Sequence, residues 1–182
     1  MIERERKYAL TKEDYLRLRS KYPQEEILQT NFYFTFEQND GFMVRIRLKK
    51  DNFEMTVKTG KKGLNGLFVS DELNADISKD EADFFLKNGI SKQKIKEYLG
   101  IDIPFDVQYV GKLDTYRTKF YFKDIVLELD KNLYGTTTDF ELECELSKDK
   151  ENTLKEFLEE NFPVLPPPSA LPKFKRWQNS LN

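Results

Sequence analysis

The sequence contains no histidine, which excludes His-ligated zinc sites, Ser-His triads, Cys-His dyads and phosphohistidine intermediates. Its single cysteine, Cys144, excludes an intrachain disulfide, as is typical of proteins in a reducing cytosol. No apolar run approaches the ~20 residues that a membrane-spanning helix needs. The first ten residues, MIERERKYAL, are too charged for a signal peptide. We therefore expect a cytoplasmic protein that has no membrane partner.

Neither sign of charge dominates. The 30 Lys and Arg residues against 32 Asp and Glu residues give a formal net charge of −2. This balance disfavours bulk attraction to nucleic acid or to an anionic membrane, so no nucleic-acid partner is expected. The 15 Phe and 9 Tyr residues are ample for a hydrophobic core, and a length of 182 residues suits one domain.

The dominant pattern is strict alternation of apolar and polar residues, which indicates β-strands with two different faces. Val44, Ile46 and Leu48, for example, alternate with charged neighbours. Runs of this kind lie at 32–36, 44–49, 53–58, 69–75, 125–130 and 140–146, with weaker runs near 105–113 and 117–123. Strands at this short spacing, with occasional helices between them, predict an antiparallel sheet or barrel.

Two helices are expected where a capping signal, Thr11 with Asp14 or Ser78 with Glu81, precedes an amphipathic segment: one over 11–21 and one beginning at Ser78. Two more are expected at 91–99, closed by Gly100, and at 149–162, which is amphipathic. Five of the seven prolines then lie in residues 163–172, which predicts a stiff, extended linker. We expect a single domain over 1–182, with its strands and helices in 1–162 and a short basic segment at 173–182.

The polar faces of the predicted strands are sorted by charge. The sorted runs are Arg45-Arg47-Lys49, Glu141-Glu143-Glu145 and Glu3-Glu5-Lys7. Like charges two residues apart lie ~7 Å apart on one face and repel each other, unless opposite charge is near. Basic side chains suit phosphate oxygens and clustered carboxylates suit Mg²⁺ or Mn²⁺, so the pattern is consistent with a metal–polyphosphate site. A solvated, salt-bridged sheet face is the alternative interpretation.

Taken in order, these motifs resemble the CYTH superfamily, also called the triphosphate tunnel metalloenzymes. The matching residues are Glu3-x-Glu5-x-Lys7, Tyr33-Phe34-x-Phe36, Arg45-x-Arg47, Lys58, Glu72, Arg117, Glu128-x-Asp130, Glu141-x-Glu143-x-Glu145, and Lys173 with Arg176. Each motif alone is weak, whereas the whole set in this order, each on one strand parity, is specific.

The resemblance implies an α+β, mainly antiparallel fold: an eight-stranded closed β-barrel, the triphosphate tunnel, with surrounding helices. The tunnel interior is charged in this family, and the apolar strand faces pack outward under the helices. Members bind a triphosphate together with a divalent metal inside the tunnel. We therefore expect Mg²⁺ or Mn²⁺ as cofactor and a triphosphate-containing small molecule as partner, such as tripolyphosphate, thiamine triphosphate or a nucleoside triphosphate.

The resemblance also implies a role for each matching residue. The expected metal ligands are Glu3 and Glu5, with a second pair drawn from Glu141, Glu143 and Glu145, whose register the motif leaves open. The expected phosphate-binding residues are Lys7, Arg45, Arg47, Lys58, Arg117, Lys173 and Arg176. The expected catalytic residues are Glu72, Glu128 and Asp130. The C-terminal basic segment corresponds to one that plugs a tunnel mouth.

Some of these residues have purely structural alternatives. Glu72 could simply pair with Lys58 or Arg47, and Lys7 with Glu5 could form an ordinary salt bridge. Tyr33 could simply pack at the tunnel wall. Cys144 is expected in the hydrophobic core, and Trp177 is expected to anchor the C-terminal tail against the barrel.

Three functions are compatible with the motifs. The first is a metal-dependent triphosphatase acting on tripolyphosphate or an organic triphosphate, and it is favoured because no base-reading motif is present. The second is a class IV-type adenylate cyclase, which forms cyclic AMP from ATP and must also hold the adenosine. The third is a non-catalytic polyphosphate or nucleotide sensor, which would gain nothing from the acidic residues. The sequence leaves a homodimer through the outer faces of the barrel open.

Overall fold

The computed structural model describes residues 2–35, 42–62, 67–169 and 171–180, without the side chains of 2, 3, 61, 62 and 148. The strands are β1 (Ile2–Leu10), β2 (Glu26–Thr35), β3 (Phe42–Lys49), β4 (Asn52–Lys62), β5 (Leu67–Ile77), β6 (Gln108–Phe122), β7 (Ile125–Tyr134) and β8 (Thr137–Glu145). The helices are α1 (Lys12–Lys21), α2 (Lys79–Asn88), α3 (Lys92–Leu99), α4 (Glu151–Asn161) and α5 (Lys173–Asn179). A short 3₁₀ helix, Lys148–Lys150, precedes α4.

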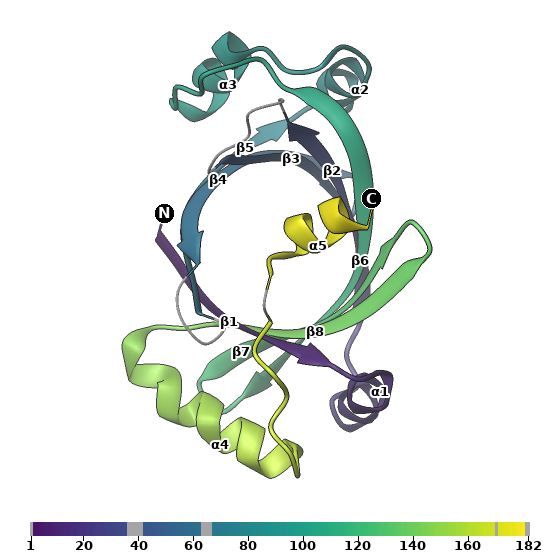
Figure 1. Ribbon diagram of the computed structural model, residues 1–182, viewed down its shortest axis with the longest axis vertical. Helices are drawn as coiled ribbons and strands as arrows, with labels where there is room; N and C mark the ends of the chain where they lie inside the picture. Colours follow the sequence, from purple (N-terminus) through teal and green to yellow (C-terminus); the bar gives the residue numbers. More distant parts are fainter. Residues whose placement is uncertain (1, 36–41, 63–66, 170, 181–182) are drawn as a thin grey trace.

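The eight strands close into an antiparallel barrel in the order β1-β5-β4-β3-β2-β6-β7-β8 (Figure 1). Helices α2 and α3 lie beyond one side of the barrel, and α1 and α4 lie beyond the opposite side. The predicted α+β fold with an eight-stranded closed barrel is thereby confirmed. No helix in the described part of the chain is long and apolar enough to cross a membrane.

Helices α1, α2 and α3 begin directly after Thr11, Ser78 and Ser91, as predicted. The hydroxyls of Thr11, Ser78 and Ser91 each accept a hydrogen bond from a backbone N–H in the first turn of the following helix. Ser78 and Glu81 form a reciprocal capping box. Each cap satisfies a donor that the helix itself cannot pair, which stabilises the start of the helix by about 1 kcal/mol.

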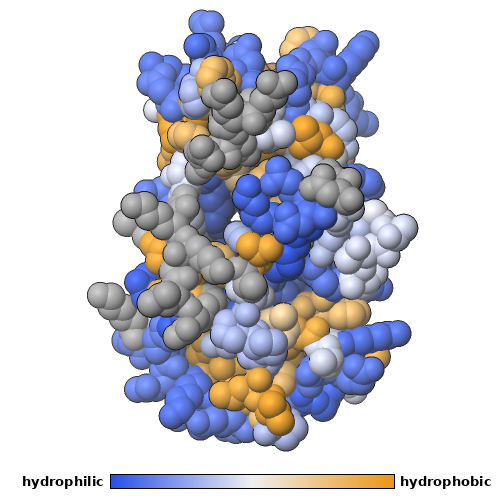
Figure 2. Space-filling view, in the orientation of Figure 1, coloured by the Kyte–Doolittle hydropathy of each residue, from blue (hydrophilic) through white to orange (hydrophobic). Residues whose placement is uncertain are grey.

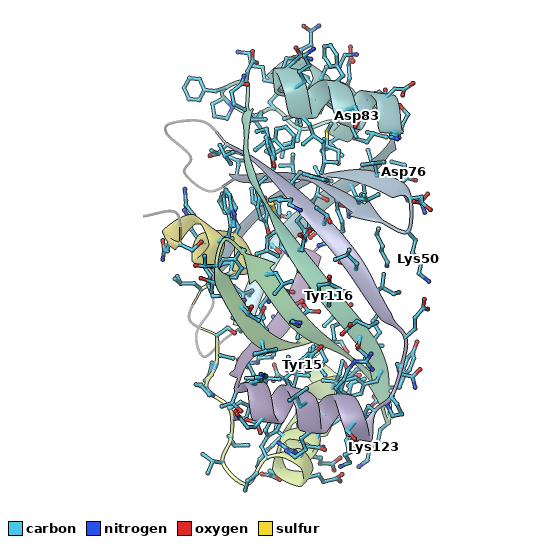
Figure 3. The ribbon with its side chains drawn as sticks, turned by 90° about the vertical axis from the view of Figure 1, so that its right-hand side faces the viewer. Tyr15, Lys50, Asp76, Asp83, Tyr116 and Lys123 are labelled. Atoms are coloured by element: carbon cyan, nitrogen blue, oxygen red, sulfur yellow. The ribbon has the colours of Figure 1, made fainter. Side chains whose placement is uncertain are left out.

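The apolar strand faces point outward and are covered by the helices. Under α1 and α4, Leu18 and Phe157 pack in one cluster with Leu142 of β8. Under α2 and α3, Phe85 and Ile95 lie in a second cluster with strands β3 and β4. The alternation then directs polar residues such as Arg117 of β6 into the barrel. The next residue back, Tyr116, lies on the side of β6 that faces the viewer in Figure 3.

One strand differs from the prediction. The weaker runs near 105–113 and 117–123 are not two strands, because a single 15-residue strand, β6, spans 108–122. A bulge opposite Tyr33 and Phe34 lets β6 pass from Gly111 to Tyr109 with one extra residue. The extra residue reverses which residues face inward, so the alternation in the sequence is broken although the strand is continuous.

The proline-rich segment predicted as a linker also pairs with β1. Strand β5 pairs with residues 2–6 of β1, which leaves the following part of that edge uncovered by β5. The N–H of Ala9 donates to the Pro167 carbonyl at 2.9 Å, and the N–H of Ser169 donates to the Lys7 carbonyl at 2.9 Å. The segment therefore satisfies backbone groups that an open edge would expose, and it directs the chain toward the barrel opening.

Helix α5 lies across one end of the barrel (Figure 1). Its Phe174 and Trp177 are buried against inward-facing Tyr33 and Leu113. This apolar cluster covers part of that end of the barrel and holds α5 there through the buried Trp177. Gly111, at the bulge, has a φ of +150°, and a Cβ there would lie 2.5 Å from Cζ2 of Trp177.

We expect Gly111→Ala to displace α5, because the added methyl group overlaps the Trp177 ring. Overpacking of this kind costs about 1–3 kcal/mol of unfolding free energy. Trp177 is the single tryptophan of the chain, so its fluorescence reports on α5 alone. The emission should shift to the red and acrylamide quenching should increase.

The control is Gly100→Ala, where φ is +69° but no atom lies within 4 Å of the added Cβ. It should lose about 1 kcal/mol through backbone strain and keep the wild-type emission. Wild-type emission in Gly111→Ala would contradict the close contact between β6 and α5.

Candidate functional site

The barrel encloses a cavity of about 400 Å³, and the space-filling view shows an opening beside α5 (Figure 2). The predicted site residues that line it are Glu5, Lys7, Arg45, Arg47, Lys58, Glu72, Arg117, Glu128, Glu143, Glu145 and Lys173. Asp130, Glu141 and Arg176 are not part of the lining, and the side chain of Glu3 lies outside the described residues. Residues from all parts of the sequence thus converge on one cavity.

Strands β1 and β8 bring acidic residues face to face. Glu5 lies opposite Glu145, and Lys7 lies opposite Glu143. The Lys7 ammonium is 2.8 Å from Oε1 of Glu143 and 3.1 Å from Oε1 of Glu5. Burial lowers the pKa of Lys7, but the carboxylates of Glu143 and Glu5 raise it by more, so that the pKa lies above its usual range. Lys7 therefore stays charged and partly neutralises this wall.

A second acidic group is fully buried. One oxygen each of Asp130, Glu141 and Glu143 lies within 4.8 Å of the others. The ammonium of Lys173, at the start of α5, is 2.5 Å from Asp130, 2.5 Å from Glu143 and 3.3 Å from Glu141. Arg117 also contacts Asp130 and Glu143, at 2.6 and 2.7 Å. The cations of β6 and α5 thus compensate carboxylates that burial would otherwise destabilise.

These contacts hold the buried carboxylates in the charged form. Burial raises the pKa of Glu143, but Lys173, Lys7 and Arg117 lower it by more, well below its usual range. Burial likewise raises the pKa of Asp130, and Arg117 and Lys173 lower it below its ordinary value. Both groups therefore contribute to stability only while they are ionised.

Arg176, one turn after Lys173, secures α5 in the same way. Its guanidinium donates to Glu141 at 2.9 Å and to Asp139 at 3.0 Å. The Ser169 hydroxyl donates to Glu141 at 2.6 Å. Glu141 is therefore engaged by the tail and does not line the cavity, whereas Glu143 and Glu145 do.

The opposite wall, on β3, carries Arg45, which pairs with Glu72, and Arg47, which pairs with no described carboxylate. The Nε of Arg47 donates to Oδ1 of Asn31 at 2.9 Å, and Arg47 forms no salt bridge with any described residue. Burial, and after it the charges of Arg45 and Arg117, lower the pKa of Arg47 to about 10. A bound anion would relieve this repulsion, because the guanidinium fork suits phosphate oxygens.

Two of the predicted catalytic carboxylates line the cavity in ion pairs. Glu72 accepts from Arg45 at 3.3 Å and contacts Lys58 at 3.2 Å, which partly bears out the structural alternative for Glu72. Glu128 contacts Arg117 and Lys119. Both carboxylates are thus flanked by cations that also face the cavity.

Sequence reasoning missed the neutral part of the lining. Gln29, Asn31, Ser70 and Thr115 all face the cavity, and Tyr33 joins them beside α5. Their inward position follows from the same alternation that places the charged residues. The signal in the sequence was therefore their place in the alternation, on the same strand face as the charged residues. Because they carry no charge, they did not stand out from an ordinary polar strand face.

The model of the CYTH domain family matches residues 1–168. The chain belongs to the CYTH domain family. No curated protein sequence matches the chain. Proteins of the CYTH family bind triphosphate substrates, and their activity depends on a divalent metal.

Solved structures share this CYTH fold. A Hippeastrum protein proposed to be an adenylyl cyclase, HpAC1, and reported to have a dominant triphosphatase activity is 20% identical, with a TM-score of 0.78. The match covers 98% of this chain and 96% of that one. A Bacillus halodurans protein proposed to be an adenylate cyclase is 28% identical, with a TM-score of 0.73 and 95% of each chain covered.

The cavity of this CYTH domain offers suitable ligands for a divalent metal. Glu5, Glu143 and Glu145 present carboxylate oxygens, the ligands that Mg²⁺ and Mn²⁺ prefer. Glu145 forms no salt bridge within the described part of the chain, although it faces Glu5 across the strands. Such a cross-strand pair of like charges is destabilising unless a cation lies nearby. Lys7 and Lys58 contact Glu5, whereas Glu145 has no cation partner among the described residues. The residues present therefore fit a divalent ion.

We expect the CYTH domain to lose stability as the pH falls below about 4, the usual range of carboxyl pKa values. The folded-state pKa values of Glu143 and Asp130 lie below their ordinary values. Their contribution is therefore complete above the unfolded-state pKa and is lost as the pH falls through the folded-state pKa. Urea denaturation at pH 7 and at pH 3 measures the difference.

Glu143→Gln should lose about 3–5 kcal/mol at pH 7, because it leaves buried cations unpaired, and its stability should depend less on pH. The control is Glu159→Gln, an exposed residue near Lys155, which should keep the wild-type pH dependence. An unchanged pH dependence in Glu143→Gln would contradict the assigned role of this carboxylate.

Proposed function

We propose that this CYTH protein is a divalent-metal-dependent hydrolase of a triphosphate substrate. The observation that carries the proposal is the charge distribution of the cavity. Arg47 has no carboxylate partner in the described structure and lies near the cations Arg45 and Arg117. On the opposing wall, Glu5 and Glu145 face each other. Lys7 and Lys58 already contact Glu5, so of these groups Arg47 and Glu145 are without an ion-pair partner among the described residues. A metal–polyphosphate complex would supply negative charge beside Arg47 and positive charge beside Glu145.

In the proposed complex the basic residues hold the phosphate chain. Arg45 and Arg47 from β3, Lys58 from β4 and Arg117 from β6 face the same cavity. Lys7 and Lys173 extend this set from β1 and α5. Positive groups at fixed positions stabilise the charge that develops on the phosphate oxygens as the P–O bond breaks.

The acidic residues would hold the metal and orient the water. Glu5, Glu143 and Glu145, together with Glu3, are the proposed ligands; a bound divalent ion neutralises phosphate charge. Water attacks the terminal phosphorus, and the bond from that phosphorus to the bridging oxygen breaks. The products are orthophosphate and diphosphate, or the corresponding organic diphosphate, and one proton is released. Glu72 or Glu128 is the proposed acceptor of that proton, since both line the cavity.

We assign Asp130 a positioning role rather than a catalytic one. It is fully buried, does not line the cavity, and binds Arg117 and Lys173 through both carboxylate oxygens. It therefore fixes two side chains that face the phosphate chain. Arg176 does not line the cavity either; by binding Glu141 it holds α5, and α5 in turn positions Lys173.

Inorganic tripolyphosphate and an organic triphosphate such as thiamine triphosphate are the proposed substrates. The similarity to the Hippeastrum protein with a dominant triphosphatase activity supports hydrolysis. Adenylate cyclase activity is the second candidate, because the Bacillus halodurans protein is proposed to have it. Both reactions would use the same basic residues, here called the phosphate clamp: Lys7, Arg45, Arg47, Lys58, Arg117 and Lys173. Hydrolysis releases orthophosphate, whereas the cyclase reaction releases pyrophosphate and forms cyclic AMP.

The first test measures orthophosphate and pyrophosphate released from tripolyphosphate, thiamine triphosphate and ATP, with Mg²⁺ or Mn²⁺ and with EDTA. We expect metal-dependent orthophosphate release. Glu5→Gln/Glu145→Gln should lower kcat/KM at least about 100-fold, because the proposed metal ligands are lost. Glu159→Gln, on the exposed face of α4, is the control and should keep wild-type activity.

Three other outcomes would contradict the triphosphatase. Pyrophosphate and cyclic AMP from ATP alone would establish the cyclase. Binding of triphosphates without turnover under either metal would favour a sensor. Undiminished hydrolysis by the double variant would show that these two carboxylates do not hold the metal.

A second test uses Arg47→Met. Loss of a charge-assisted contact to phosphate should raise KM or the substrate Kd about 10–100-fold. The unfolding free energy should stay equal or rise, because burial and two neighbouring cations disfavour the charged side chain in the free protein. Assay and urea denaturation together check this; a loss of stability without a loss of affinity would show that Arg47 is a structural residue.

A further inference from the structure

Ser70 is a buried hydroxyl with no assigned role. It lies on β5, lines the cavity and is 7% exposed. Its Oγ has no hydrogen-bond partner among the described residues. Buried polar groups in native proteins are nearly always hydrogen-bonded, so an unpaired hydroxyl in a cavity wall points to a ligand.

The surroundings of Ser70 place it beside the phosphate clamp. Glu72, two residues further along β5 on the same face, contacts Arg45 and Lys58. On the neighbouring strand β4, the residue opposite Ser70 is Gly60, which brings no side chain to that part of the wall. Lys58 in turn contacts Glu5, one of the proposed metal ligands. Ser70 therefore lies where the basic and acidic parts of the cavity meet.

A second polar atom of the same wall is also unpaired. The Nε of Arg45 is buried and has no hydrogen-bond partner in the described structure, although its Nη2 contacts Glu72 at 3.3 Å. A hydroxyl and a guanidinium N–H can both donate, whereas phosphate oxygens only accept. The two unpaired atoms thus match one class of ligand, an oxyanion.

We propose that Ser70 is a further substrate-binding residue, whose hydroxyl donates a hydrogen bond to a non-bridging phosphate oxygen of the triphosphate. The proposal rests on the proposed function of the same cavity. A neutral donor is suited to this position, because a lysine there would be drawn to Glu5 or Glu72 instead of the substrate. Ser70 thus adds a phosphate contact without disturbing the ion pairs around it.

The test compares Ser70→Ala with the wild type in tripolyphosphate binding, measured by calorimetry in EDTA so that no turnover occurs. We expect about tenfold weaker binding, the usual effect of losing a hydrogen bond to a charged group. The thermal unfolding midpoint should be unchanged or higher, because the variant removes a buried hydroxyl that has no hydrogen-bond partner among the described residues. Ser70→Thr should restore binding to within about threefold, since it keeps the hydroxyl.

Thr118→Ala is the matched control. Thr118 is also buried and its Oγ1 is also unpaired among the described residues, but it pairs in register with Leu129, which belongs to the outer core. It does not line the cavity. Its substitution should leave tripolyphosphate binding at the wild-type level.

The outcomes separate this proposal from the proposed function. If the wild type does not bind tripolyphosphate with or without Mg²⁺, both fail. If the wild type binds and Ser70→Ala binds equally well, the role of Ser70 is overturned while the triphosphate site stands. Equal weakening by Ser70→Ala and Thr118→Ala would also overturn it, because the effect would then come from general loosening of the barrel.

Discussion

Charge compensation inside the barrel is the constraint on which the rest of the structure depends. Carboxylates such as Asp130 and Glu143 are buried, and burial alone would favour their neutral forms. They stay ionised because Arg117 from β6 and Lys173 from α5 reach them. The barrel wall and the C-terminal helix are thus held together by the same ion pairs. Removing one of these carboxylates would leave a buried cation without its partner, and removing one of the cations would leave a buried carboxylate without its partner.

A charged interior also determines where the hydrophobic core can lie. The apolar strand faces must point outward, so helices are required to cover them. Two separate clusters result, one under α1 and α4 and one under α2 and α3. A third, smaller cluster forms where α5 covers part of one end of the barrel with Trp177. Each helix therefore has a structural task, and α5 additionally brings Lys173 into the cavity wall.

The degree of compensation varies around the cavity, and this variation separates structure from function. Near α5 each carboxylate of the buried group has a cation within ion-pair distance. On β3 the guanidinium of Arg47 has an amide as its partner among the described residues, and Glu145 faces another carboxylate. Asp130 and Glu141, which are paired and lie outside the cavity lining, stabilise the fold, whereas Arg47 and Glu145 line the cavity without an ion-pair partner among the described residues and are available to a ligand. The same reasoning, applied to neutral groups, identifies Ser70.

The sequence by itself determined which residues share a strand face, because alternation with a period of two places each side chain on one face of its strand. This alternation predicted an antiparallel sheet or barrel, and the resemblance to the CYTH superfamily added the closed barrel with its charged face inward. The sequence also predicted the helix caps, which depend on residues three positions apart. It did not predict the continuous strand β6, since one extra residue at a bulge reverses the alternation. Only the tertiary structure decided how the carboxylates divide between cavity and tail: Glu143 and Glu145 line the cavity, while Glu141 is bound by Arg176. Parity is a local property of the backbone, whereas pairing depends on the closure of the barrel and the position of α5, which bring distant residues together.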